Sequence, residues 1–243
     1  MEKVLTPEIS VVILCYRSGD FAKIFYNKVS EVLRRNNLDY EIVLVGNYRP
    51  ETNDDTPEII KEISNSDSRV RTVIKEKLKP EEAMGWDMRS GFEAAVGKTI
   101  LVIDGDGQMP PEDIPRLYNK LVKERLDLCK GRRISRGDGP YRKFISMVFN
   151  AVMHLLFPGI VSNDINGKPK IFTRYAYSKM KLESNDWFID AEIMIQARRL
   201  NFRIGEMEVE FHENPKRRSF ISFKANLEFI KNIITYRLKE FQA

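Results

Sequence analysis

Cysteine is scarce in this chain. The 243 residues contain two cysteines, Cys15 and Cys129, which lie far apart and form no CxxC pair. Both fall in strand-like apolar runs, where a free cysteine behaves as a small hydrophobic residue. The sequence therefore argues against a disulfide framework and predicts two buried thiols in a reducing compartment.

Long apolar runs are missing as well. No stretch reaches the roughly 20 apolar residues of a membrane-spanning helix. The N-terminal segment MEKVLTPEIS lacks the apolar core and cleavage site of a signal peptide. Internal repeats and low-complexity segments are also absent. We therefore expect a cytoplasmic protein, which could still lie on the inner face of a membrane.

A large excess of charge of either sign is absent too. The formal net charge is +5, with 31% charged and 42% hydrophobic residues, as in a soluble domain with an ample core. The basic balance favours acidic partners such as nucleotide phosphates, an anionic membrane or nucleic acid. We expect no nucleic acid, because the basic residues fall in two loops and no RNA- or DNA-binding motif is present.

The chain does contain a buried strand that ends in carboxylates. Residues 99–103 (TILVI) are apolar or β-branched, which predicts a parallel strand covered on both faces. Asp104, Asp106 and Gln108 follow at alternate positions, so their side chains can converge on one point. Three oxygen donors suit a divalent cation, Mg²⁺ or Mn²⁺, which keeps open positions for phosphate oxygens. The alternative is an acidic turn between a strand and a helix.

Strands and helices alternate along the first part of the chain. Apolar runs predict strands at residues 9–15, 40–45, 70–74, 99–103 and 126–130, with helices at 21–36, from 56, at 80–96 and at 114–124. This order predicts an α/β fold with a mostly parallel sheet and right-handed crossovers. Gly85, Gly91 and Gly97 would let the third helix approach the sheet or a ligand closely; the alternative is a weakened helix.

The second part of the chain begins with a basic loop and an apolar helix. Residues 131–142 (GRRISRGDGPYR) could clamp phosphates or could simply be solvated. The helix predicted at 143–157 is apolar except for a stripe of Ser146, Asn150 and His154. It is therefore either a core helix or one that meets lipid. We expect His154 to be a hydrogen-bonded helix residue rather than a ligand.

Turns and short elements follow, and then a long helix. Residues 162–170 form a turn-rich loop, and short elements are predicted at 171–172, 175–180, 185–200 and 203–209. A second basic loop covers 212–219. From residue 220 an apolar stripe comprises Phe223, Leu227, Ile230, Ile234, Leu238 and Phe241. This amphipathic helix, 220–243, either packs against the domain formed by 1–219 or lies in a membrane interface.

The order of these features resembles glycosyltransferase family 2, the GT-A fold nucleotide-sugar transferases. Within the family it is most similar to the polyprenyl-phosphate (dolichol-phosphate-type) sugar transferases. The resemblance covers residues 10–219 and rests chiefly on ISVVILCYR and on GWDMRSGFEAAVGKTILVIDGDGQMPPEDIPRL. It implies metal-dependent, inverting transfer from a UDP- or GDP-sugar to a membrane-associated acceptor, polyprenyl phosphate or else a glycan hydroxyl.

The resemblance also implies roles for individual residues. Asp104, Asp106 and Gln108 would form the metal and diphosphate site. Asp164 would lie near the acceptor; with Asp190 and Glu192 it would be a candidate base for a hydroxyl acceptor, whereas a lipid phosphate needs none. The remaining candidates for substrate binding are Tyr16, Asn47, Tyr48, Arg89, Arg132, Arg133, Arg217 and Arg218.

One segment departs from the family pattern. Most members carry Asp-Asp-x-Ser-x-Asp after the second strand, whereas this chain reads GNYR at 46–49 and regains carboxylates at Asp54 and Asp55. Asn47 could hydrogen-bond a nucleoside base, and Tyr48 could stack on one. This departure leaves open the alternative that the chain is a non-catalytic relative that binds nucleotide-sugars. Nucleotidyl transfer is disfavoured, because the first strand is not followed by a glycine-rich basic signature.

Overall fold

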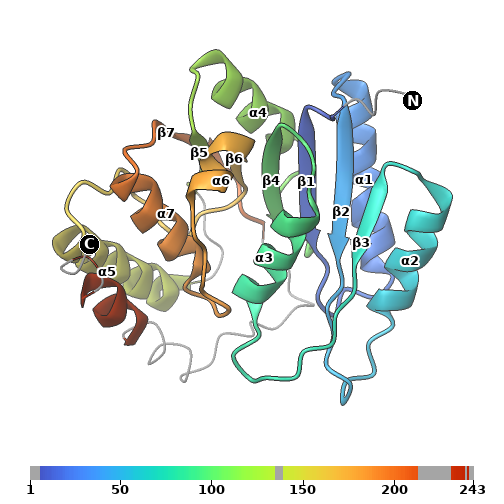
Figure 1. Cartoon of the computed structure of the whole chain (residues 1–243), viewed down its shortest axis with the longest axis horizontal. Helices are drawn as coiled ribbons and strands as arrows, with labels where there is room; N and C mark the ends of the chain where they lie inside the picture. Colours follow the sequence, from blue (N-terminus) through green and yellow to red (C-terminus); the bar gives the residue numbers. More distant parts are fainter. Residues whose placement is uncertain (1–5, 135–138, 213–230, 239, 241–243) are drawn as a thin grey trace.

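The computed structural model describes residues 6–134, 139–212, 231–238 and 240. Its centre is a seven-stranded sheet in the order β3-β2-β1-β4-β6-β5-β7 (Figure 1). The strands are β1 (Ile9–Leu14), β2 (Tyr40–Val45), β3 (Val70–Val73), β4 (Thr99–Asp104), β5 (Leu128–Arg133), β6 (Lys170–Thr173) and β7 (Ile204–Val209). The helices are α1 (Phe21–Arg35), α2 (Thr56–Ser66), α3 (Met84–Ala94), α4 (Asp113–Lys123), α5 (Gly139–Leu156), α6 (Arg174–Lys179) and α7 (Ile189–Arg199). The predicted α/β fold is confirmed.

The sheet is mostly parallel, as predicted, with one reversed strand. β6 runs antiparallel to both of its neighbours, β4 and β5, whereas the remaining strand pairs are parallel. β4 and β5 follow each other in sequence but are not neighbours in the sheet. β6, which comes later in the chain, lies between them. The register pairs Val102 of β4 with Lys170 of β6. This pairing brings the loop before β6 to the carboxyl end of β4.

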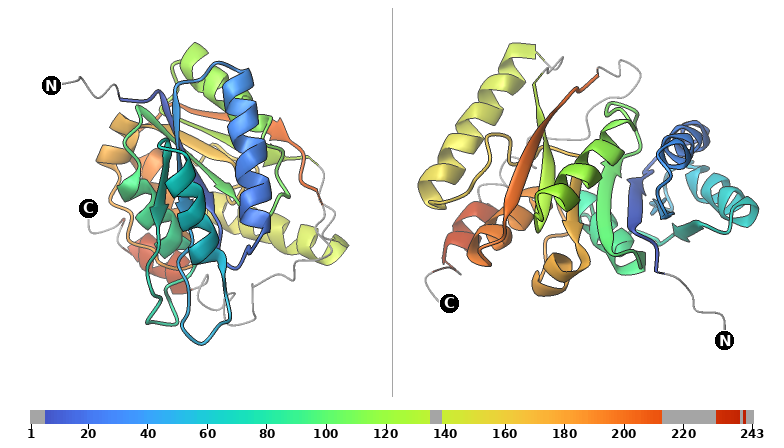
Figure 2. Two further views of the ribbon diagram at one scale, coloured as in Figure 1. Left: turned by 90° about the vertical axis from the view of Figure 1, so that its right-hand side faces the viewer. Right: turned by 90° about the horizontal axis from the view of Figure 1, so that it is seen from above.

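Two apolar cores cover the two faces of the sheet. In β1, Val12 and Leu14 point to one core, whereas Val11 and Ile13 point to the other, as the two-residue period of a strand requires. The first core contains side chains of α3, α5, α6 and α7, and the second contains side chains of α1, α2 and α4. Figure 2 shows α1 and α3 on opposite faces. The sheet is thus buried on both sides, as continuous apolar strands predict.

Both cysteines lie in this interior. Cys15 and Cys129 are free and buried, so the prediction of buried thiols is confirmed. Burial raises the pKa of the Cys129 thiol to about 11, because the low-dielectric interior disfavours the thiolate. Among the residues described, no helix combines the length and apolar character needed to cross a membrane.

The described part of the C-terminal helix, residues 231–238, packs on the domain through residues outside the predicted stripe. Ile233 joins the core that contains α5 and α7, and the Tyr236 ring lies 5.2 Å from that of Phe188. The stripe residues Ile234 and Leu238 are 54% and 57% exposed. The rest of the predicted helix, 220–230, lies outside the described residues. The boundary between 1–219 and 220–243 stays a prediction.

The glycines of α3 permit close packing, as predicted. A Cβ atom on Gly91 would lie 2.4 Å from Val12 Cγ1 and 2.9 Å from Val45 Cγ2. Gly97 similarly faces the backbone and side chain of Ser10, beyond the end of α3. The helix therefore rests directly on β1 and β2, with no room for a larger side chain at position 91.

We expect Gly91→Ala to lower the free energy of unfolding by about 1–3 kcal/mol, because the added methyl overpacks the interface with Val12 and Val45. Helix propensity alone would predict the opposite sign, a gain of about 1 kcal/mol. Denaturant unfolding measures the difference. The exposed Glu93→Ala on the same helix is the control. A Gly91→Ala protein as stable as the wild type would contradict this packing.

Candidate active site

The candidate residues gather at one edge of the sheet. β1, β2, β4 and β5 run in the same direction and so end at the same edge. Ligands of open α/β sheets bind outside the carboxyl ends of the strands. Tyr16 and Asn47 follow β1 and β2, and Asp104 closes β4. Adjacent strands thus deliver these three residues together, as the sequence predicts.

Asp104 pairs with a lysine that the sequence assigned no role. Lys168 Nζ lies 2.7 Å from Asp104 Oδ1 and 3.8 Å from Asp190 Oδ2. Burial disfavours its charged form, yet the pKa of Lys168 is raised, because the carboxylates of Asp104, Asp190 and Asp106 outweigh the burial. The ammonium is therefore a fixed positive charge at the carboxyl end of β4.

Asp190 is buried at the first turn of α7 and faces a second lysine. Lys170 Nζ lies 2.5 Å from Asp190 Oδ1 and also donates to the Gly167 carbonyl at 2.8 Å. Burial lowers the pKa of Lys170 to about 8, although Asp190 opposes the shift. Asp190 thus lies close to both Lys168 and Lys170. In the sequence, these two lysines are marked only by their alternate spacing at the start of a short strand, β6.

The predicted metal donors are only partly preorganised. Gln108 donates its backbone N–H to Asp106 Oδ1 at 3.1 Å, and its side-chain amide donates to the His212 carbonyl at 3.0 Å. No cluster of three or more His, Cys, Asp or Glu suited to a metal occurs among the described residues. Asp104 and Asp106 nevertheless lie two residues apart at the carboxyl end of β4, and both are partly exposed. This donor set fits a hard divalent cation that takes its remaining ligands from a diphosphate.

Asp164 is held by Arg133, the last residue of β5. Arg133 donates to its two carboxylate oxygens at 2.8 and 2.7 Å, and the Arg133 backbone N–H donates at 3.1 Å. The buried Lys130 supports the same loop by donating to the Asp164 carbonyl and to Glu206. The structure therefore brings together two separately predicted candidates, Asp164 and Arg133, in a two-pronged ion pair.

A cavity of about 550 Å³ opens beside this pair. Its lining comprises Arg132, Arg133, Ile134, Asn163 and Asp164 together with Ser146, Met147, Asn150 and His154 of α5. The polar stripe predicted on α5 thus faces the cavity. His154 Nε2 lies 2.9 Å from the Ser162 carbonyl, which confirms the hydrogen-bonded role predicted for this residue.

Two glycines permit close backbone contacts between segments that supply lining residues of this cavity. A Cβ atom on Gly167 would lie 2.3 Å from the Gly131 carbonyl oxygen, and one on Gly131 would lie 2.6 Å from the Lys168 carbonyl oxygen. The end of β5 and the loop before β6 therefore touch through their main chains. Only glycine fits at either position.

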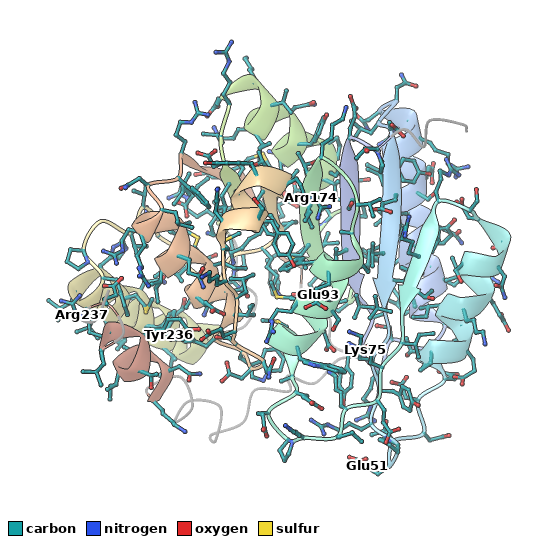
Figure 3. The ribbon with its side chains drawn as sticks, in the orientation of Figure 1. Glu51, Lys75, Glu93, Arg174, Tyr236 and Arg237 are labelled. Carbon is teal, nitrogen blue, oxygen red and sulfur yellow. The ribbon has the colours of Figure 1, made fainter. Side chains whose placement is uncertain are left out.

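Glu192 has a saturated carboxylate away from this edge. It accepts hydrogen bonds from the backbone N–H groups of Glu183 and Ser184 at 2.8 and 2.9 Å, and from the Tyr236 hydroxyl at 2.6 Å. Figure 3 shows Tyr236 beside α7. The base role predicted for Glu192 stays a prediction, but these contacts favour a structural role. Arg89 similarly binds the Glu183 carbonyl and Asn185.

Asn47 belongs to a buried polar cluster. Its amide donates to Asp87 at 2.9 Å and to Ser90 at 3.3 Å, and its carbonyl accepts from the Lys75 backbone at 2.8 Å. Lys77 Nζ lies 2.6 Å from Asp87 Oδ2. Burial raises the pKa of Asp87 and lowers that of Lys77. The contact of Asn47 with a base stays a prediction, because its side chain already has protein partners.

The two candidate tyrosines are partly exposed at this edge. Lys77 Nζ lies 4.3 Å from the centroid of the Tyr16 ring, and Tyr48 forms a bridge to Glu76. Stacking of either ring on a nucleoside base stays a prediction. Arg132 pairs with Glu208 at the rim of the cavity. Arg217 and Arg218 lie outside the described residues.

Known proteins resemble this chain in sequence. Glycosyltransferase AglD of Haloferax volcanii is 26% identical over 164 residues, covering 65% of this chain and 26% of that protein. An undecaprenyl-phosphate 4-deoxy-4-formamido-L-arabinose transferase of Photorhabdus laumondii is 27% identical over 146 residues, covering 60% of this chain and 43% of that protein. The chain therefore spans less than half the length of either relative.

A solved structure resembles the fold. Glucosyl-3-phosphoglycerate synthase from Mycobacterium tuberculosis, in complex with Mn²⁺, UDP-glucose and phosphoglyceric acid, matches with a TM-score of 0.66 and 16% identity. The match covers 95% of this chain and 79% of the synthase. It confirms the predicted GT-A type of sheet.

The family model of Glycosyl transferase family 2 matches residues 10–188, which include β1 to β6 and the carboxyl end of β4. This match covers well over half of the sequence. The chain belongs to glycosyl transferase family 2.

Proposed function

We propose that this chain transfers a sugar from a UDP- or GDP-sugar to polyprenyl phosphate at the cytoplasmic face of a membrane. The family supports glycosyl transfer, and the name of the Photorhabdus relative supports a lipid phosphate acceptor. The acceptor phosphate oxygen would attack the anomeric carbon as the bond to the nucleoside diphosphate breaks. The bonding electrons leave with the diphosphate, and a single displacement of this kind inverts the anomeric centre.

Asp104 and Asp106 are the donor-side residues in this proposal. They would hold Mg²⁺ or Mn²⁺, which supplies Lewis-acid neutralisation of the leaving diphosphate. The Mn²⁺ and UDP-glucose in the mycobacterial synthase support this assignment. Lys168 adds a positive charge beside Asp104. Tyr16 and Tyr48 would contact the base.

The ion pairs made by the candidate bases favour a phosphate acceptor over a hydroxyl acceptor. A hydroxyl acceptor requires a carboxylate that is free to take its proton. Asp164 accepts two hydrogen bonds from Arg133, and Asp190 accepts one from Lys170 and lies near Lys168. Each of these carboxylates is therefore already engaged by cations of the protein. A phosphate acceptor is already ionised and needs no such base.

The cavity beside Asp164 suits an amphiphilic acceptor. Arg132, Asn150, His154 and Asn163 give its wall polar groups for a phosphate. On the same helix, Met147 is 61% and Leu155 is 79% exposed. Exposed apolar side chains next to a polar cavity are typical of surfaces that meet lipid. We infer that α5 lies against the membrane, so that the chain takes its acceptor from the lipid surface.

Binding of the donor tests the enzyme proposal. We expect UDP or GDP to bind in the presence of Mn²⁺, measured by calorimetric titration. Binding should weaken at least about tenfold in Asp104→Asn/Asp106→Asn, because two charges that hold the metal are removed. The exposed Asp39→Asn is the control. Failure of both nucleotides to bind well-folded wild-type protein would contradict the proposed donor site and with it the enzyme proposal.

Acceptor chemistry is tested by offering matched lipids. We expect sugar transfer from the bound donor to polyprenyl phosphate, and none to the polyprenol of equal length, because the alcohol is not ionised. Radiolabelled product extracted into organic solvent measures both reactions. Equal transfer to the alcohol or to a glycan hydroxyl would contradict the phosphate assignment and restore a base role for Asp164 or Asp190.

Membrane contact is tested on α5. We expect Met147→Glu/Leu155→Glu to reduce flotation with anionic liposomes several-fold, because two carboxylates replace exposed apolar contacts. Ile24→Glu is the matched control, since Ile24 is an exposed apolar residue on α1. Flotation of the double variant at the wild-type level would rule out α5 as the contact.

A further inference from the structure

Lys168 is a buried lysine at the site where we propose that a metal binds. Its side chain is 3% exposed, and its ammonium has three neighbours: Asp104 Oδ1 at 2.7 Å, Met84 Sδ at 2.9 Å and Asp190 Oδ2 at 3.8 Å. Sulfur is a weak acceptor. The ion pair with Asp104 is therefore the main contact of this ammonium in the free chain, and it uses a carboxylate that a metal would need.

The fold fixes this arrangement. The antiparallel register pairs Thr99 with Thr173 and Val102 with Lys170. Asp104 and Lys168 each lie two residues beyond the Val102–Lys170 pair that ends this ladder. The pairing of β4 with β6 therefore brings the two segments that carry them to the same edge of the sheet.

We propose that Lys168 is a built-in counter-ion of Asp104 that opposes metal binding in the free chain and moves to the diphosphate when donor and metal bind together. The half of this proposal that concerns the diphosphate rests on the proposed function. The half that concerns the metal takes only the metal at Asp104 from that proposal, is argued from the ion pair, and is tested without nucleotide.

The charges near Asp104 support this exchange. Three carboxylates, Asp104, Asp106 and Asp190, share the region with the ammonium groups of Lys168 and Lys170. A divalent cation that arrived alone would meet an ammonium already paired with its ligand, and like charges at short range repel strongly in a buried setting. A diphosphate brings oxygens that can accept the hydrogen bonds Lys168 gives up. Metal and nucleotide should therefore strengthen each other's binding.

The test measures two binding reactions in Lys168→Gln. Electron paramagnetic resonance of free Mn²⁺ gives the metal affinity without nucleotide, which should tighten about tenfold because a competing charge is gone. Calorimetry with UDP and GDP in EDTA gives the nucleotide affinity without metal, which should weaken by a similar factor. These opposite signs separate the proposal from general damage, which would weaken both.

Two further variants complete the test. Lys168→Arg keeps the charge and should retain metal affinity near that of the wild type. Lys120→Gln removes an ammonium that pairs with Glu124 on α4, and should leave Mn²⁺ affinity unchanged. Circular dichroism confirms folding of each variant. Mn²⁺ binding by Lys168→Gln that is equal to or weaker than wild type overturns the proposal. Because this measurement needs no nucleotide, it stays decisive even if UDP and GDP fail to bind and the proposed function falls.

Discussion

The antiparallel pairing of β6 with β4 is the constraint on which this site depends. It sets the residues before β6 against the carboxyl end of β4, so that Lys168 meets Asp104 and Lys170 reaches Asp190. A parallel strand in that position would send its lysines to the opposite edge of the sheet. The reversal therefore supplies positive charge where β4 delivers negative charge.

The interior of the sheet was predictable from sequence because its strands are continuous apolar runs. The predicted bounds of β2 agree with the structure, and those of β1, β3 and β4 differ by one residue. The place of β6 was not predictable, since a short segment such as KIFT carries no periodicity. Its position between β4 and β5 depends on contacts between residues about 70 apart in sequence. Local pattern contains no information about such pairing.

Candidate site residues could be identified from the sequence where polar residues follow strands. Charged residues that are buried in the fold could not be identified in this way. Asp104 and Arg133 were identified because they end a strand or follow one, and Asp164 was identified from the family resemblance. Lys168 and Lys170 were assigned no role from the sequence because lysine is ordinarily exposed. Only the fold reveals the carboxylates that stabilise them. Asn47 shows that a residue placed after a strand can also have a structural role. Its place after β2 suggested a ligand contact, but its amide is used within a cluster whose other members, Asp87 and Lys77, lie 40 and 30 residues away.

The close approach of Gly131 and Gly167 has a consequence for how this site can evolve. Neither position tolerates a side chain, so substitutions there are lost through folding. The exposed side chains of Ile134 and Met147, which line the cavity, are free of that restriction. Under the proposed function, lineages that share this backbone can therefore diversify in their acceptors by changing such lining residues, while both glycines stay invariant.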